Sequence, residues 1–317
     1  GTADAVKMGE RLVSTKFLMA NGDVIVKKED IARLAARDGN TMALVKKENA
    51  VGVGVVEVED NKIVRIYEKR ENPPTQLVNT GIYLLTSEIF SAISATPASP
   101  RGEYELTASL QLLIDRGTTV SYHMLDYWLD LSYPWDLLQV NEELMARLEP
   151  QNLGEVEDGA TLKGPISIGK GTVVRSGSYI VGPVIIGENC DIGPNCYIRP
   201  SSTIGDSCHI GSSVEVKNSI VMRGSKVPHH NYVGDSIIGE NCNFGAGTKV
   251  ANLRLDGMEI KSMEVDTKRR KLGAIVGDGV QTGINASLNV GCAIGNDSFI
   301  GPGVVVSGVI SPNSQIL

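Results

Sequence analysis

The chain has 317 residues, a formal net charge of −7 at pH 7 and a pI near 5.3. The acidic balance argues against a nucleic acid or an anionic membrane as partner, because such binding needs a basic face, whereas a phosphorylated small molecule needs only a local basic pocket. The length predicts two domains. No apolar run approaches the roughly 18 residues of a membrane span and no signal segment opens the chain, so we expect a cytoplasmic protein.

Strand-like and helix-like segments alternate in residues 1–149. The apolar runs FLMANGDVIV, ALVKK, VGVGVVEVE and VNTGIYLLT are typical of strands. Helical patterns cover residues 31–37, 87–95, 105–116 and 134–148. Ser87 is a suitable N-cap. This alternation predicts an α/β domain.

Two aspartates in this half follow or end strand-like runs. Asp23 lies in NGD, after an apolar strand, and Asp130 lies in WLD, before the helix at 134–148. The C-terminal ends of strands in α/β sheets are common ligand sites, and two carboxylates that converge there would suit Mg²⁺ carrying nucleotide phosphates. The alternative is that both are ordinary loop aspartates.

The pieces GTADAV, NGD, VGVVEVE, YEKR, NTG and WLD occur in an order that resembles the sugar-1-phosphate nucleotidylyltransferases. The resemblance covers most of residues 1–149 and implies a Rossmann-like fold. It also implies roles for particular residues. These are base contacts from Gly1 and Thr2, Mg²⁺ ligation by Asp23 and Asp130, and sugar-phosphate binding by Gly54, Glu68, Lys69 and Asn79.

One part of the family pattern is absent from this half. The Gly-rich GxGTR loop and its following lysine, which bind the triphosphate in the family, have no counterpart here. Because backbone amides of such a loop stabilise charge during phosphoryl chemistry, we expect that the chain as given does not transfer nucleotides. We interpret residues 1–149 as a partial domain that has lost this segment by truncation, proteolysis or disorder.

A six-residue repeat runs through residues 150–317. Gly, Asn and Asp recur at the turn-forming positions between the apolar ones, so each hexad predicts a short strand with one inward aliphatic side chain and a tight corner. Three hexads make one triangular coil, and stacked coils bury a continuous core. The pattern predicts a left-handed parallel β-helix. Its apolar positions are Leu162, Ile168, Val174, Ile180, Ile186, Ile192, Ile198, Ile204, Ile210, Val216 and Met222, then Ile238, Phe244 and Val250, then Val276, Thr282, Leu288, Ile294, Ile300 and Val306.

All five cysteines lie four residues after an aliphatic repeat position, in a slot that otherwise holds Ser, Thr, Val or Ala. There is no CxxC pair and no histidine at metal-ligand spacing. We therefore expect small buried hydrophobes and no catalytic thiol. They are Cys190, Cys196, Cys208, Cys242 and Cys292.

The repeat is interrupted by GSKVPHHNYVGD, between Met222 and Ile238. A repeat protein usually breaks its pattern where function intrudes. Histidine is a suitable general base because it changes its charge near neutral pH. His229 and His230 are therefore candidates, although a merely polar loop remains the alternative. His209 and His123 have no such context, and we expect structural or surface roles for them.

The pieces SVEVKNS, GSKVPHHNYVGD and IGENCNFGAGT resemble the acetyltransferase half of the bacterial bifunctional N-acetylglucosamine-1-phosphate uridylyltransferase/glucosamine-1-phosphate acetyltransferases. The resemblance implies acetyl-CoA as co-substrate, an amino-sugar phosphate as acceptor, UTP or another nucleotide for the first domain, and a homotrimer. It also implies site residues. These are His229 as base supported by Glu215, Arg199, Lys217 and Tyr232 on the sugar phosphate, Asn243 and Asn252 as positioning residues, and the Ala246 amide as oxyanion donor.

Residues 254–271 are longer than the bacterial counterpart and look more like archaeal members. A family lysine cannot be placed within them, and Lys261 is the nearest candidate. The run TKRRK either binds phosphates of coenzyme A or the sugar, or is a solvated charged loop.

The leading hypothesis is acetyl transfer from acetyl-CoA to glucosamine-1-phosphate or galactosamine-1-phosphate, coupled in the intact protein to uridylyl transfer in UDP-N-acetylglucosamine synthesis. A second hypothesis is a sugar-1-phosphate nucleotidylyltransferase using UTP, dTTP or GTP, whose β-helix serves oligomerisation or regulation. A third is a regulatory assembly subunit that binds nucleotide sugar without turnover.

Overall fold

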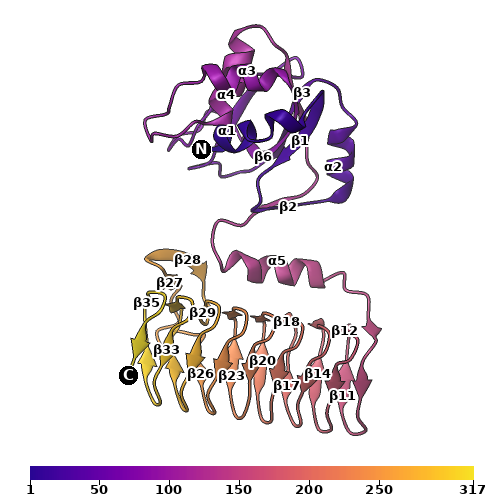
Figure 1. The fold of residues 1–317 in the computed structure, drawn as a ribbon, viewed down its shortest axis with the longest axis vertical. Coiled ribbons are helices and arrows are strands. Elements are labelled where there is room, and N and C mark those ends of the chain that lie inside the picture. The colour runs from indigo at the N-terminus through magenta and orange to yellow at the C-terminus, as the bar shows by residue number, and fades with distance from the viewer. The chain divides into compact units, whose positions relative to one another are not determined.

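The computed structural model describes all 317 residues in two compact units, Gly1–Ser132 and Tyr133–Leu317 (Figure 1). The division falls before the boundary expected at 149/150. The cause is helix α5 (Asp136–Met145), which packs on the β-helix and belongs with it by contacts. No helix has the length and apolar character needed to cross a bilayer.

The first unit is a sheet with helices on both faces. Side chains alternate across the strands, so Met42 and Leu44 pack under α1, α3 and α4, while the neighbouring Ala43 packs towards α2. The strand order is β1-β6-β3-β7-β5-β4, and only β3 and β7 run parallel. The strands are β1 Lys16–Ala20, β3 Asn40–Lys46, β4 Val55–Glu59, β5 Lys62–Tyr67, β6 Leu77–Thr86 and β7 Val120–Met124. The helices are α1 Thr2–Lys7, α2 Lys28–Ala35, α3 Glu88–Ala95 and α4 Leu106–Asp115, with a 3₁₀ turn at Glu10–Leu12.

The run FLMANGDVIV, expected as one strand, is two. NGD forms the turn after β1, and β2 (Val24–Val26) pairs with β8 (Trp128–Asp130) in a separate small sheet. The helix expected from residue 31 begins at Lys28. Ser87 precedes α3 as predicted, but its backbone is helical and its side chain makes no capping hydrogen bond.

The second unit is a parallel β-helix with three sheets, which confirms the predicted fold class. The first sheet contains β10 Glu155–Val156, β13 Val173–Val174, β16 Asp191–Ile192, β19 His209–Ile210, β22 Lys226–Val227, β25 Asn243–Phe244, β30 Gln281–Thr282, β33 Phe299–Ile300 and β36 Gln315–Ile316. The second contains β11 Thr161–Lys163, β14 Tyr179–Val181, β17 Tyr197–Ile198, β20 Glu215–Lys217, β23 Tyr232–Gly234, β26 Lys249–Val250, β31 Ser287–Leu288 and β34 Val305–Val306. The third contains β9 Gln151–Asn152, β12 Ile166–Ile168, β15 Val184–Ile186, β18 Ser202–Ile204, β21 Ile220–Val221, β24 Ile237–Ile238, β29 Ile275–Val276, β32 Ala293–Ile294 and β35 Val309–Ile310.

The interior of the β-helix is filled by the predicted repeat positions, with two exceptions. Leu162 lies in the first complete coil and is 37% exposed. Met222 was expected to point inward, but the buried residue is Val221, which pairs with Ile204 below and Ile238 above. The prediction for Met222 is wrong because the corner between β20 and β21 is one residue shorter than the hexad count assumes.

The stretch predicted as irregular keeps the coil geometry. Val227 and Val233 lie within it and are fully buried in the same core. One residue is missing from the count at each of two stacked corners between the second and third sheets, which hold Asn218 and Asp235 in left-handed backbone conformations. The five cysteines are all buried and free, as predicted.

The coil leaves its regular path after β26 and returns at β29. The inserted segment forms a hairpin of β27 (Ile260–Ser262) and β28 (Val265–Arg269). Ile260 and Leu272 pack in one apolar cluster with Trp135 and Leu138, beside and within α5, on the outer face of the third sheet. Figure 1 shows α5 lying along the coils.

Candidate functional site

One cavity of about 390 Å³ in the first unit collects nearly all the side chains that the nucleotidylyltransferase resemblance implicates there. Thr2, Asp23, Gly54, Glu68, Lys69, Asn79 and Asp130 all line it. Gly1 does not line it. Gly1 instead packs closely against the backbone of Tyr104. A Cβ at Gly1 would lie 2.3 Å from the carbonyl oxygen of Tyr104, so no larger residue fits there.

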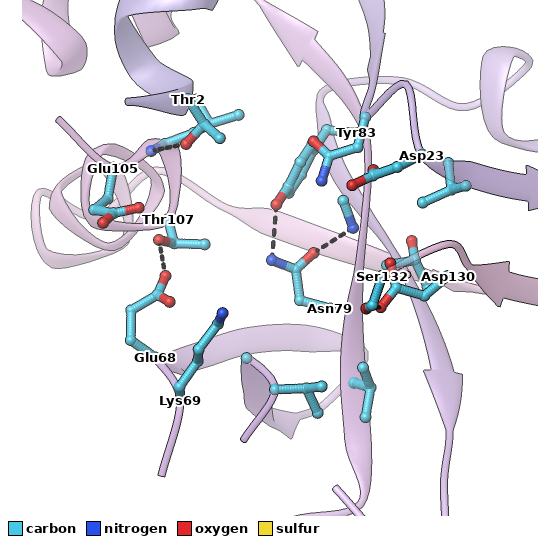
Figure 2. A pocket seen from close by; sticks show the side chains of 18 of the residues that line it. Thr2, Asp23, Glu68, Lys69, Asn79, Tyr83, Glu105, Thr107, Asp130 and Ser132 are labelled. Atoms are coloured by element: carbon cyan, nitrogen blue, oxygen red, sulfur yellow. Dashed lines mark hydrogen bonds between the residues drawn. The ribbon is translucent and has the colours of Figure 1, made fainter. Parts of the chain in front are cut away.

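Asn79 occupies the middle of this cavity in Figure 2. Its Nδ2 donates to Tyr83 Oη at 2.7 Å, and its Oδ1 accepts from the N–H of Gly81 at 3.1 Å. Burial raises the pKa of Tyr83, so the phenol stays protonated at neutral pH. No motif pointed to Tyr83, although it lies four residues after Asn79 on β6 and thus on the same face.

The two aspartates lie on one side of the cavity, with Glu68 and Lys69 on the other (Figure 2). The backbone brings the aspartates together, since Val24 pairs with Asp130 and the N–H of Leu131 donates to the carbonyl of Asp23 at 2.8 Å. Ser132 Oγ donates to Asp130 Oδ2 at 2.8 Å. Two carboxylates without a third ligand fit Mg²⁺, which is usually held by one or two carboxylates plus substrate phosphates.

Glu68 and Thr2 both form hydrogen bonds with the first turn of α4. The hydroxyl of Thr107 donates to Glu68, and the N–H of Leu106 donates to Thr2 Oγ1 at 3.0 Å. These contacts join segments far apart in the chain. Sequence reasoning missed Thr107, because no local pattern indicates which loop this helix faces.

The second candidate site lies in the β-helix, at the corner shortened by one residue between the second and third sheets. Asp235 is its centre. The carboxylate is 3% exposed and accepts from Lys217 Nζ at 2.7 Å and from Asn252 Nδ2 at 2.5 Å. Asn252 Nδ2 also donates to Tyr232 Oη at 3.1 Å. The structure thus brings Lys217, Tyr232 and Asn252 together through a carboxylate that sequence reasoning did not single out.

Burial, followed by the nearby carboxylates of Glu215 and Asp235, raises the pKa of the Tyr232 phenol. Tyr232 therefore remains a neutral phenol at neutral pH, where its hydroxyl can donate or accept a hydrogen bond.

Arg199 and Glu215 form a pair beside this corner, with Nη1 and Oε1 2.9 Å apart. The pair raises the pKa of the Arg199 guanidinium, which stays charged. Glu215 is one coil below Tyr232 in the second sheet. Its carboxylate accepts a hydrogen bond from Arg199 and none from His229. The expected contact in which Glu215 supports the base is therefore not present within this chain.

His229 stands at the preceding corner, between β22 and β23. His229 and His230 both have positive φ, 28° and 57°, and both side chains are exposed. The carbonyl of His229 accepts from the N–H of Gly247 at 3.0 Å, so the Gly245-Ala246-Gly247 corner stacks on the histidine corner. The N–H of Ala246 donates to no acceptor within the chain.

Asn243 begins β25 with an exposed side chain, next to the Ala246 corner. A cavity of about 340 Å³ lies on the second sheet, and Tyr232, Lys249, Asn252 and Ser287 are among its lining residues. The remaining histidines lie elsewhere: His209 Nδ1 is 3.4 Å from Asp191 on the first sheet, and His123 is on β7.

Comparison with known proteins confirms both resemblances. The nucleotidyl transferase family model matches residues 1–147, and the GMPPB C-terminal domain model matches residues 180–289. The bifunctional sugar-1-phosphate nucleotidylyltransferase/acetyltransferase of Sulfurisphaera tokodaii is 41% identical over 312 residues, which cover 94% of this chain and 77% of that protein. The bifunctional protein GlmU of Methanocaldococcus jannaschii is 39% identical and that of Methanococcus maripaludis strain C7 is 40% identical, each across 100% of this chain and 78% of the relative.

Proposed function

Because this chain belongs to the family of bifunctional sugar-1-phosphate nucleotidylyltransferase/acetyltransferases, we propose that its β-helix transfers acetyl from acetyl-CoA to the amine of glucosamine-1-phosphate or galactosamine-1-phosphate. In the intact protein, the first unit transfers uridylyl from UTP to the acetylated sugar phosphate, which yields UDP-N-acetylhexosamine. The observation that carries the proposal is the position of the exposed His229. Its corner stacks on the corner that holds the unpaired N–H of Ala246, and the polar cluster around Asp235 lies at the other end of β23.

The acetyl-transfer step follows from these groups. The sugar amine attacks the thioester carbonyl, and the imidazole of His229 takes the proton that the nitrogen loses. The N–H of Ala246 donates to the oxyanion that develops on the carbonyl oxygen, a contribution of roughly 3 kcal/mol for one such donor. Collapse of the tetrahedral intermediate breaks the carbon–sulfur bond, and the departing thiolate takes the proton from His229 and leaves as the thiol.

The polar corner holds the acceptor in this proposal. Arg199, Lys217 and Tyr232 bind the sugar phosphate, and Asn252, fixed by its bond to Asp235, orients the sugar. Asn243 positions the reacting groups beside the Ala246 corner. The β-helices assemble as a homotrimer.

In the first unit, Asp23 and Asp130 hold Mg²⁺, which carries the nucleotide phosphates. The sugar phosphate is bound by Glu68, Lys69 and Asn79, with Gly54 leaving room for it. Gly1 and Thr2 contact the base. Because the Gly-rich phosphate loop has no counterpart in the sequence, we expect nucleotide transfer to be absent from these 317 residues.

The decisive experiment compares thiol release by His229→Asn and His230→Asn. Asparagine tolerates the positive φ of both positions but cannot act as a base, so backbone strain does not confound the comparison. We expect a loss of roughly 10²- to 10⁴-fold for His229→Asn and little change for His230→Asn. Turnover by His229→Asn at the wild-type rate would contradict the mechanism. Absence of thiol release in the wild type would favour a nucleotidylyltransferase whose β-helix only assembles subunits.

A further inference from the structure

The inserted segment returns to the β-helix beside the polar corner and forms a second cavity there. The cavity measures about 430 Å³ and is lined by Asp235, Leu253, Arg269, Arg270 and Lys271. Backbone contacts close its base, since Leu253 bridges Lys271 and the N–H of Leu272 donates to the carbonyl of Asn252 at 3.1 Å. Asp235 therefore faces both Lys217 and the inserted basic run.

The cations assigned to the substrate phosphate at this corner already have carboxylate partners. Lys217 Nζ is 2.7 Å from Asp235, and Arg199 is paired with Glu215. A phosphate that met only these pairs would find little net positive charge. Tight phosphate binding calls for further cations whose charge is not already matched.

Arg270 and Lys271 are such cations. Both are exposed, and neither forms an ion pair. Arg270 Nε donates to the carbonyl of Gly257 at 3.2 Å, which holds the guanidinium while both terminal nitrogens stay free. Arg269 differs, because its Nη2 lies 3.9 Å from Glu142 on α5.

The basic run TKRRK is anchored by buried residues before and after it. Ile260, on β27, and Leu272, directly after the basic run, are at most 1% exposed and pack against Trp135 and Leu138. Thr267 Oγ1 donates to the carbonyl of Ile260 at 2.6 Å across the hairpin. The cations are thus presented on a structured segment, which lowers the entropic cost of binding.

We propose that Arg270 and Lys271 bind a phosphate group of a substrate of acetyl transfer, and that the inserted segment is a phosphate-binding element of this chain. The proposal rests on the acetyl transfer proposed above. Two substrates could supply the anion, the amino-sugar phosphate or coenzyme A.

The test replaces both residues, as Arg270→Gln/Lys271→Gln, and measures KM separately for glucosamine-1-phosphate and acetyl-CoA. Lys268→Gln is the matched control, because Lys268 lies in the same inserted segment, is paired with Asp266 at 3.1 Å and does not line the cavity. We expect KM for one substrate to rise by roughly tenfold with kcat nearly unchanged, and the control to stay within about twofold. The substrate whose KM rises supplies the phosphate.

Calorimetric binding of glucosamine-1-phosphate and of coenzyme A provides the second readout. Weaker binding of one of them to the double variant, and not to the control, supports the proposal, whereas equal binding of both by all three proteins overturns it. If the wild type releases no thiol, acetyl transfer fails as the proposed function, and the calorimetric comparison alone decides the role of Arg270 and Lys271.

Discussion

The cysteines show how position in a coil sets the chemistry of a side chain. Each is buried in the β-helix core, and the Sγ atoms of Cys190, Cys208 and Cys242 each lie 3.1 Å from a backbone carbonyl of the next coil. Burial raises the pKa of Cys208 to about 11 and that of Cys292 to about 12. The thiolate is the reactive form, so these thiols remain inert at neutral pH.

We therefore expect no reaction of the native protein with Ellman's reagent at pH 8, where the raised pKa keeps each thiol protonated. All five should react after unfolding in guanidinium chloride. The absorbance of the released chromophore measures both states. Rapid labelling of the folded protein would show that a cysteine is accessible and ionised, contrary to the structure.

At the scale of the element, each strand of the β-helix is stable only through its neighbours. Strands such as β13 contain two residues and pair with one strand below and one above. One inward aliphatic per strand then supplies most of the burial. Val174 on β13 is fully buried, whereas Val309 on β35 is 58% exposed.

The substitution Val174→Ala should lower the free energy of unfolding by about 2–3 kcal/mol, because it removes buried methyl groups and leaves a cavity. The same change at Val309 should alter stability by less than about 0.5 kcal/mol. Urea denaturation followed by circular dichroism gives both values. Equal effects of the two substitutions would mean that the assigned register of the core is incorrect.

At the scale of the whole molecule, the two units have separate cores and separate sites. The first core is built from residues of α1, α3, α4 and the mixed sheet, and the second from the coils alone. Asp23 and Asp130 belong to the first unit, and His229 belongs to the second. No group of three metal-ligating side chains occurs in either unit.

Acetyl transfer should therefore be unchanged by EDTA and by Asp23→Asn, since neither touches a group proposed for that reaction. Binding of UTP in the presence of Mg²⁺ should be weakened by the same substitution, because one of the two carboxylates is lost. Thiol release and calorimetry measure the two effects. A loss of thiol release on chelation would place a metal in the acetyl-transfer site.

The candidate sites were only partly predictable from sequence. The residues that the motifs singled out lie together in the structure: Asp23, Glu68 and Asn79 line one cavity, and Lys217, Tyr232 and Asn252 form one cluster around Asp235. Their partners were missed, because a motif names a residue but not what it contacts. Asp235 is the clearest example, since the side chains that donate hydrogen bonds to its carboxylate come from two different coils, the one below and the one above it.

The sequence by itself determined the β-helix, most of its inward aliphatics and the burial of its cysteines, because a six-residue period is a local property that stacking only repeats. Only the tertiary structure decided that Val221 replaces Met222 in the core. The types of residue at a corner do not show that this corner is one residue shorter than the others. The packing of α5 on the coils and the place of Arg270 beside Asp235 were decided there too. These depend on contacts between segments far apart in the chain, and no local pattern encodes them.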